Sequence, residues 1–408
     1  MKQLFNIYSN ASFYLILGFL FLINFSIAGS YLLFTLLLIQ ACVFFIIRFT
    51  HKDQPPALSH PPFPGFPPYY KYFLLYIFFT LLSSLFGLNP AISLKHDKEF
   101  FIYLLIPLFL LILHTPKRLK QSLMVVLLST TLSAAWGILT VIRQKGVSLD
   151  YRLKGFLSHW MTYSGLLMLA FIFFFIYVFH EPSKKRKIPI GIGLAIILTT
   201  IGFTLTRSIW VGTIAALGLF VFYARPKLLY FIPVCLIIAL FLPGPVKDRA
   251  VSIIDMNNAT NKDRFFMASI ALNIFKDYPL TGVGPNNIRM VYDRYKPAQA
   301  EQTNMHLHNN FLHVLAERGI FALLALLSAF VSIIVALIRK IKHAFDLEKT
   351  LSVCTLFTFI GFIVAGFFEY NYGDSEVRFL LYYVLTLPFL RLNPETDTQI
   401  ETHAEVKG

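Results

Sequence analysis

Charged side chains are scarce in this sequence. Only 14% of its 408 residues are Asp, Glu, Lys or Arg, whereas 56% are hydrophobic. Soluble domains typically contain about 45–50% apolar and about 25% charged residues. The composition therefore excludes an ordinary soluble domain and predicts a chain that buries much of its surface in lipid.

Cysteine is nearly absent as well. Cys42, Cys235 and Cys354 lie in separate apolar runs, and the sequence contains no Cys-x-x-Cys pair. Such pairs are typical of metal and redox sites. The three thiols are therefore expected to be packing residues, and they say nothing about the redox compartment.

Long apolar runs are what the sequence has in abundance. Each can cross a hydrocarbon layer of ~30 Å as a helix that satisfies its own backbone hydrogen bonds. The first run lacks a small-residue cleavage site after a basic stretch, so we expect a retained helix. The pattern predicts an all-α integral membrane protein with about 12 transmembrane helices, at Ala11–Ala28, Tyr31–Ile47, Tyr72–Leu88, Phe100–His114, Leu123–Ile142, Met161–Phe179, Ile188–Leu205, Ile209–Tyr223, Leu228–Leu242, Phe321–Ile338, Leu351–Phe367 and Val377–Leu390.

The basic residues predict the orientation of these helices. The formal charge is +15, but Lys and Arg are spread over loops between apolar runs, which argues against nucleic acid as a partner. Short loops rich in Lys and Arg stay in the cytoplasm, and this places both termini there. The expected division is helices one to nine in residues 1–242, a large periplasmic loop in 243–318, three more helices in 319–390 and a cytoplasmic tail in 391–408.

The long loop (residues 243–318) is the most polar part of the chain, and it is basic. Apolar residues between Lys262 and Lys276 recur at the spacing of one helix face. Asn261 is the expected N-cap of this short amphipathic helix, which places Arg264 in its first turn. A guanidinium beside free backbone N–H groups at a helix start favours phosphate binding, although a solvated arginine is the simpler alternative.

A glycine-rich stretch follows, Thr281-Gly282-Val283-Gly284-Pro285-Asn286-Asn287. We interpret it as a tight turn, with Asn286 or Asn287 capping a helix that begins near Ile288. It lacks the third glycine and the flanking strand of a dinucleotide-binding fingerprint.

The last part of the loop contains His306-Leu307-His308-Asn309-Asn310. Asn309 or Asn310 can cap a short helix that ends at Gly319 in a left-handed conformation. His308 would then lie at a helix N-terminus near arginines, which should disfavour its protonated form and keep it available as a base. A metal site formed by His306, His308 and His313 is a minor alternative, because no carboxylate or cysteine is close in sequence.

Two further arginines lie at the ends of apolar runs on the expected outer side. Arg207 begins one run, in Thr206-Arg207-Ser208-Ile209-Trp210, and Arg152 has a similar position. An ionisable residue at membrane depth is costly and suggests a functional site, whereas an interfacial anchor is the alternative for Arg207. Arg152, Asn309 and Arg289 are the additional candidates for substrate binding.

These motifs together resemble the O-antigen ligase/polymerase superfamily, a group of polytopic membrane enzymes with one large periplasmic loop. His308-Asn309, nine residues and then Gly319 match the pattern of the ligases, although Ala322 replaces their second glycine. Arg264 followed by Pro279–Pro285 resembles another part of the signature, with Ala268 where an aromatic residue is common. Arg207–Trp210 is similar to the arginine segment that precedes the loop.

The resemblance implies a GT-C-like fold and a glycosyltransferase of the bacterial inner membrane. It implies transfer of a glycan from undecaprenyl diphosphate to a lipid A–core acceptor at the periplasmic face, without metal or other cofactor. Arg207 and Arg264 would hold the diphosphate, and His308 would be the general base. An O-antigen polymerase and a protein O-oligosaccharyltransferase are alternatives within the family. A polysaccharide transporter or flippase is disfavoured, because the spans contain few ionisable residues.

Overall fold

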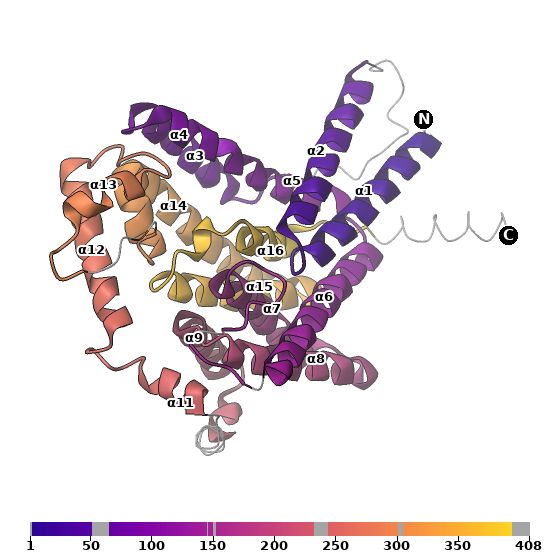
Figure 1. The fold of residues 1–408 in the computed structure, drawn as a ribbon. Coiled ribbons are helices and arrows are strands. Elements are labelled where there is room, and N and C mark those ends of the chain that lie inside the picture. Colours follow the sequence, from indigo (N-terminus) through magenta and orange to yellow (C-terminus); the bar gives the residue numbers. More distant parts are fainter. Residues whose placement is uncertain are drawn as a thin grey trace.

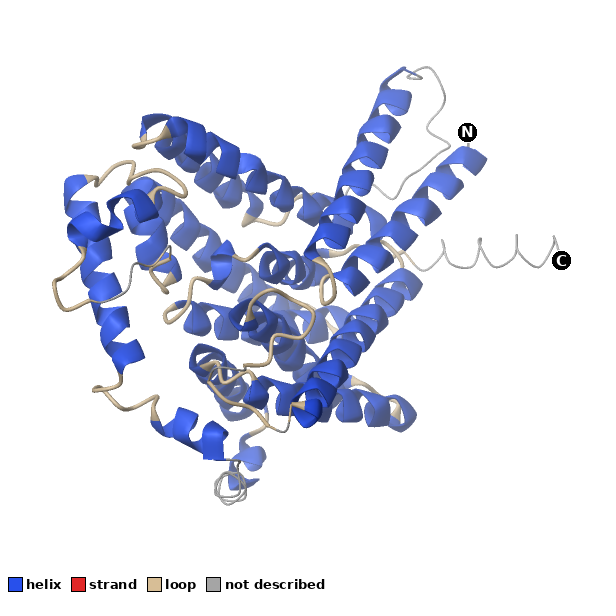
Figure 2. Ribbon diagram, viewed as in Figure 1, coloured by secondary structure: helices blue, strands red, loops and turns tan. Residues whose placement is uncertain are grey.

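The computed structural model describes residues 2–50, 65–144, 146–149, 152–231, 244–300, 304 and 306–393. Within these ranges every regular element is a helix (Figure 2). Among the described residues, seven helices are long and apolar enough to cross a membrane, and two shorter apolar helices accompany them. The all-α membrane fold is therefore supported, whereas the count of about 12 spans stays a prediction. The expected span Leu228–Leu242 lies largely outside the described residues.

The first half of the chain contains a helical hairpin followed by a set of single helices. Its elements are α1 (Lys2–Leu22), α2 (Ile27–Thr50), α3 (Tyr70–Phe86), α4 (Pro90–His96), η1 (Asp97–Leu104), α5 (Leu105–Ile112), α6 (Pro116–Arg143), α7 (Trp160–His180), α8 (Lys184–Phe203), α9 (Arg207–Ala224) and η2 (Pro226–Phe231).

The second half begins with the helices of the long loop. Its elements are α11 (Gly244–Val251), α12 (Ala259–Asp277), α13 (Ile288–Tyr295), α14 (Asn310–His343), α15 (Asp346–Gly366), η3 (Asn371–Gly373), α16 (Ser375–Thr386) and η4 (Leu387–Phe389).

Two of the expected spans have the wrong boundaries. The run Ala11–Ala28 is not one helix, because α1 ends at Leu22 and α2 already starts at Ile27. The Ser26 hydroxyl accepts a hydrogen bond from the backbone N–H of Gly29 at 3.1 Å, which caps the start of α2.

The run Phe100–His114 is also broken, into η1 and α5. Pro107 explains the break. As the third residue of α5, it lies in the first turn, where its missing N–H removes no intrahelical hydrogen bond. One continuous helix would place this proline in its interior.

α7 and α15 form the centre of the bundle. They pack against each other, and α15 also packs against α9. The most apolar windows of α7 and α15 are 78% and 72% buried, compared with 22% for α2. The outer helices instead expose large apolar side chains such as Leu32, Leu128 and Ile214. These surfaces suit contact with lipid tails, which are as apolar as leucine.

The long loop covers one side of this bundle. α11, α12 and α13 form an arc there, and α1 begins on the opposite side (Figure 1). The apolar face of α12 expected from the sequence is confirmed, because Met267, Ile270, Ala271 and Ile274 are buried. These side chains form a small core with residues of α13, separate from the core of the bundle.

Gly319 joins the long loop to the bundle. It divides α14 at a kink with φ of 78°, so the short helix ends there in a left-handed conformation, as the sequence predicts. A Cβ atom added to Gly319 would lie 2.1 Å from the Leu280 carbonyl oxygen. No other residue type fits this position without moving the Leu280 segment.

Replacing Gly319 by Ala should therefore destabilise the protein. A strained left-handed residue costs on the order of 1–3 kcal/mol, and the contact with Leu280 adds to that cost. Thermal unfolding of the detergent-solubilised protein would measure the effect. Gly218→Ala is the matched control, because Gly218 lies in α9 with no atom within 4 Å of an added Cβ. Equal unfolding temperatures for the two variants would contradict the prediction.

Candidate active site

The motifs singled out in the sequence meet at one cavity of about 400 Å³. Arg207 comes from the start of α9, Arg264 from α12, and His308 and Asn309 from the segment before α14. Most of the remaining wall is apolar, and includes Val211, Ile253, Met256, Phe265, Leu312, Phe367 and Phe368. The cavity thus combines two cations and an imidazole with a surface suited to a lipid chain.

Two larger cavities lie elsewhere, with volumes of about 600 and 570 Å³. Their walls include Lys340 and Glu348 in one case, and Asp346 and Lys349 in the other. Both lie around the junction of α14 and α15, at the far end of α14 from His308. The smaller cavity is therefore the candidate site, because it contains the functional groups.

Arg207 is 4% exposed and fixes the long loop to the bundle. Its guanidinium donates to the Ser252 carbonyl oxygen at 2.5 Å and to the Thr260 hydroxyl at 2.6 Å. Its buried Nε has no hydrogen-bond partner among the described residues. A buried donor without an acceptor is costly, and an anion in the cavity is one group that could satisfy it.

Arg264 is half-buried on the cavity wall, but not in the first turn of α12. The helix begins at Ala259, and Asn258, not Asn261, is its N-cap. The Asn258 side chain accepts from the backbone N–H of Thr260 at 3.2 Å. The expectation that Arg264 lies beside the free backbone N–H groups at the start of this helix is therefore wrong. Its charge remains, and its guanidinium has no hydrogen bond or ion pair with any described residue.

His308 is paired with a carboxylate that the sequence reasoning missed. Its Nδ1 lies 2.7 Å from Oε1 of Glu369, which is in the connection between α15 and α16. A carboxylate can only accept a hydrogen bond, so Nδ1 carries a proton and donates a hydrogen bond to Glu369. Nε2 of neutral His308 is then left with the lone pair, which is the arrangement required of a base.

The pairing with Glu369 determines the pKa of His308. Burial by itself lowers the pKa of His308, and the Arg264 charge acts in the same direction. The charge and hydrogen bond of Glu369 outweigh both, so the pKa is raised above its usual value. The expectation that nearby arginines keep His308 neutral is therefore wrong in its net direction. The carboxyl group of Glu369 shows the complementary change: burial raises its pKa, but His308 and Arg264 lower it overall.

The neighbouring residue Asn309 holds the His308 segment in place through its side chain. His308 has a φ of 43°, an uncommon conformation for a residue with a side chain. The next residue, Asn309, is the N-cap of α14, as expected, and its side chain accepts from Phe311 N and Leu312 N, each at 2.9 Å. Its Nδ2 donates to the Phe367 carbonyl oxygen at 2.9 Å. Asn309 thus ties the start of α14 to the segment that carries Glu369.

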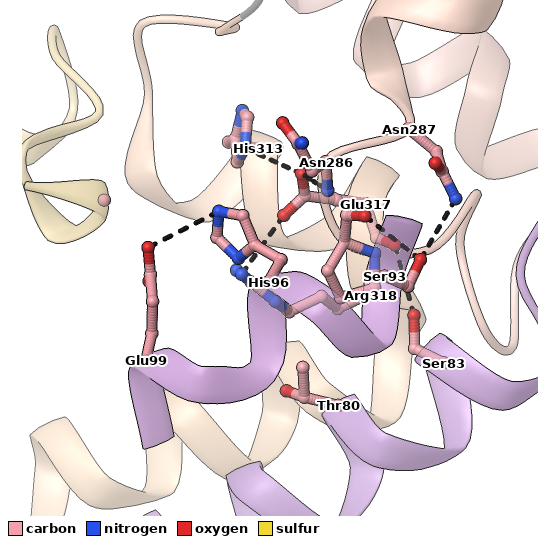
Figure 3. A network of polar contacts seen from close by, with 12 residues as sticks. Thr80, Ser83, Ser93, His96, Glu99, Asn286, Asn287, His313, Glu317 and Arg318 are labelled. Atoms are coloured by element: carbon pink, nitrogen blue, oxygen red, sulfur yellow. Dashed lines mark hydrogen bonds and ion pairs between the residues drawn. The ribbon is translucent and has the colours of Figure 1, made fainter. Parts of the chain in front are cut away.

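A buried polar network fixes the glycine-rich turn beside this segment (Figure 3). The Glu317 carboxylate accepts from Asn286 N at 2.6 Å and pairs with Arg318 and His313. Asn287 precedes the helix that begins at Ile288, but its side chain does not cap it. Its Nδ2 instead donates to Ser93 Oγ at 3.1 Å. The interpretation of this stretch as a structural turn agrees with these contacts.

The other candidates lie outside this cavity. Arg152 donates through Nε to the Leu149 carbonyl oxygen at 3.1 Å, and its guanidinium lies 4.9 Å from the centre of the Trp160 ring. Arg289 is exposed on α13 and does not line the cavity.

The alternative of a metal site formed by His306, His308 and His313 has little support among the described residues. His306 lies beside His313 and Tyr370, and burial together with His313 lowers its pKa to about 4. In the part of the chain that the structure describes, no group of three or more His, Cys, Asp or Glu side chains is arranged to hold a metal ion.

Residues 192–327 match a family model described as O-antigen ligase. The matched segment is about a third of the chain and contains Arg207, Arg264, His308 and Gly319, whereas Glu369 lies beyond it. The match confirms the resemblance to the O-antigen ligase/polymerase superfamily. Together with the apolar helices, it supports a membrane protein that is similar to this glycosyltransferase-like family. Among curated proteins, none matches the sequence of this chain.

Replacing Glu369 by Gln should lower the pKa of His308, because burial and Arg264 would then act without an opposing carboxylate. Titration by nuclear magnetic resonance of protein with labelled histidines would follow it, and a His308→Ala variant would assign the signal. Glu348→Gln is the control, because Glu348 pairs with Lys340 and has no contact with His308. An unchanged pKa in the Glu369→Gln variant would contradict the assigned pairing.

Proposed function

We propose that this chain, whose residues 192–327 match a family model described as O-antigen ligase, is a metal-independent glycosyltransferase of the bacterial inner membrane. It moves a glycan from undecaprenyl diphosphate to a lipid A–core acceptor. The observation that carries this proposal is the convergence of Arg207, Arg264 and His308 on one largely apolar cavity. That combination matches a substrate with a lipid tail, an anionic diphosphate and a sugar.

The two arginines act on the leaving group. As the bond between the anomeric carbon and the diphosphate oxygen breaks, its electron pair moves to the diphosphate. Arg264 has no hydrogen bond to a described residue, and Arg207 adds a second positive charge on the cavity wall. Donors already positioned where negative charge grows stabilise the transition state more than the ground state.

His308 acts on the nucleophile. An acceptor hydroxyl forms the new bond to the anomeric carbon from the opposite face, and its proton goes to Nε2 of His308. Glu369 orients the imidazole and stabilises the imidazolium that results. Because only neutral His308 can take the proton, transfer should slow as the pH falls through the raised pKa of this residue.

The apolar wall provides a place for the lipid tail. Phe265 is 59% exposed and Met256 63% exposed, although both belong to the cavity wall. Large exposed apolar side chains beside a charged site favour a lipid ligand. The first isoprene units would lie along them, with the diphosphate toward the arginines.

The pattern of lipopolysaccharide in a deletion strain tests the proposed function. We expect the whole O-antigen ladder to disappear while polymer accumulates on the lipid carrier. Gel electrophoresis of lipopolysaccharide, with analysis of the lipid-linked glycans, would show both changes. Retention of a single repeat unit on the lipid A–core would instead identify a polymerase, and an unchanged ladder would contradict both functions.

Substitutions of the site residues should affect the transfer rate and donor binding differently. His308→Ala should lower the transfer rate by ~10²–10⁴-fold, the usual contribution of a general base, with donor binding largely retained. Arg264→Ala should weaken donor binding and rate together, and Lys should restore them only in part because an ammonium lacks the planar fork. The assays are ligation in the deletion strain and donor-lipid binding to each purified variant. The binding assay contains EDTA, because the proposed function needs no metal.

Arg294→Ala is the control for these variants, because Arg294 is exposed on α13 and its guanidinium lies over Tyr295. Normal ligation by His308→Ala, or its failure through lost donor binding alone, would contradict the assignment of the base. Arg207→Ala needs a stability measurement as well, because Arg207 also holds Ser252 and Thr260.

The proposed orientation places the N-terminus and Lys184–Lys187 in the cytoplasm and residues 262–308 in the periplasm. It is motivated by the basic short loops and by the separation of α1 from α12 across the bundle (Figure 1). Single cysteines at residue 187 and at the exposed residue 290, in a background without Cys42, Cys235 and Cys354, would be treated with an impermeant thiol reagent in intact cells. We expect labelling at 290 only, and labelling at 187 only would reverse the orientation.

A further inference from the structure

A further arginine, Arg249 of α11, is connected to the candidate site although no motif marks it. Its Nε donates to the Leu205 carbonyl oxygen at 3.1 Å, two residues before Arg207. Its own carbonyl accepts from the Ser252 hydroxyl at 2.7 Å, and Ser252 in turn accepts from Arg207. Arg249 and Arg207 are therefore held in one short hydrogen-bonded unit.

The direction of Arg249 follows from the local backbone. The helical turn continues past α11, because Ser252 N donates to the Asp248 carbonyl oxygen at 3.0 Å. Residues four positions apart on such a turn lie on the same side, and Ile253 is four residues after Arg249. Ile253 lines the cavity that contains Arg207 and Arg264. Arg249 itself does not line this cavity, but its contacts with Leu205 and Ser252 place it beside Arg207, which does.

Leu205 keeps this arrangement in place. It is fully buried and has a φ of 51°, a conformation that is uncommon for a leucine. In this conformation its carbonyl oxygen accepts from Arg249. Strained residues of this kind cluster at functional sites, and this one fixes the position of a charge.

Arg249 still has donors to offer. Only its Nε is engaged, and neither terminal nitrogen has a partner among the residues that the structure describes. Burial and the charges of Arg207, Arg152 and Arg264 lower its pKa to about 10, so the group is cationic at neutral pH. Several cations held together in this way favour a ligand with more than one negative group.

We propose that Arg249 binds the second phosphate of a lipid diphosphate and makes the site selective for diphosphates over lipids with a single phosphate. Arg207 and Arg264 contact the phosphate nearer the sugar, and Arg249 contacts the phosphate nearer the lipid. This inference rests on the proposed function, because it assigns the two phosphates of the proposed donor to different arginines. A diphosphate is longer than a single phosphate, so its ends need cationic groups at two places.

Binding of three lipids to the purified full-length protein tests this assignment. The probes are undecaprenyl diphosphate, undecaprenyl monophosphate and phosphatidylglycerol, each added to protein in detergent. In the Arg249→Gln variant, affinity for the diphosphate should fall by about tenfold or more, as expected for a lost hydrogen bond to a charged group. Affinity for the two lipids with a single phosphate should change by less than about twofold, on the order of the weak exposed charge effects.

Two further variants make the result specific. Arg249→Lys keeps the charge but lacks the planar fork, so its preference for the diphosphate should lie between those of the unmodified protein and Arg249→Gln. If Arg249→Gln proves too unstable to purify, an unchanged preference in Arg249→Lys contradicts the inference. Arg294→Gln removes an equal charge from the exposed face of α13 and should leave all three affinities unchanged.

Three results would overturn the inference. They are an equal loss of affinity for all three lipids in Arg249→Gln, an unchanged preference in that variant, and a loss of the same size in Arg294→Gln. If the unmodified protein binds no undecaprenyl diphosphate, the proposed function fails together with the inference. If it binds the diphosphate and Arg249→Gln binds it equally well, the inference alone fails.

Discussion

The contact between Gly319 and Leu280 determines where the groups of the candidate site lie. At this point the backbone of α14 and the end of the α12 segment touch, with no room for a side chain. Ile320 N donates to the Pro279 carbonyl oxygen at 3.0 Å, and Gly284 N donates to that of Glu317 at 2.8 Å. These bonds fix the long loop to the one helix that begins directly after His308. This backbone contact holds α12 against α14, and Arg264 and His308 line the same cavity.

Electrostatic repulsion is the cost of this arrangement. Burial, and after it the charges of Arg207, Arg152 and Arg264, lower the pKa of Arg249. The carboxylate of Glu369, which interacts with the charge of Arg264, is hydrogen-bonded to His308. Glu369 consequently controls the imidazole and leaves the arginines largely uncompensated. A bound anion would offset the repulsion between these arginines, which favours a phosphate-containing ligand. The apolar wall strengthens that interaction by limiting access of water.

The sequence predicted the parts of the site that depend on local patterns. His308, Asn309 and Gly319 belong to one short helix, and its cap and left-handed end could be recognised from the residue types alone. Arg264 was placed correctly on α12 but in the wrong turn, because Asn258 and Asn261 are equally good caps by sequence. Glu369 could not be predicted, because it lies 61 residues from His308 in the chain and only the packing of α14 on α15 brings the two together. Pro107 was the available signal for the broken helix, since an interior proline is incompatible with one continuous span.

The candidate base and the candidate anion site are built from different parts of the chain. Arg207, Arg249 and Arg264 come from α9, α11 and α12, whereas His308 depends on the α15–α16 connection through Glu369 and Phe367. Under the proposed function, the first group holds the donor and the second group activates the acceptor. Changes in the α15–α16 connection could then alter which hydroxyl reaches His308 without disturbing the diphosphate. Under the proposed function, this separation would allow the acceptor to change while the donor site is kept.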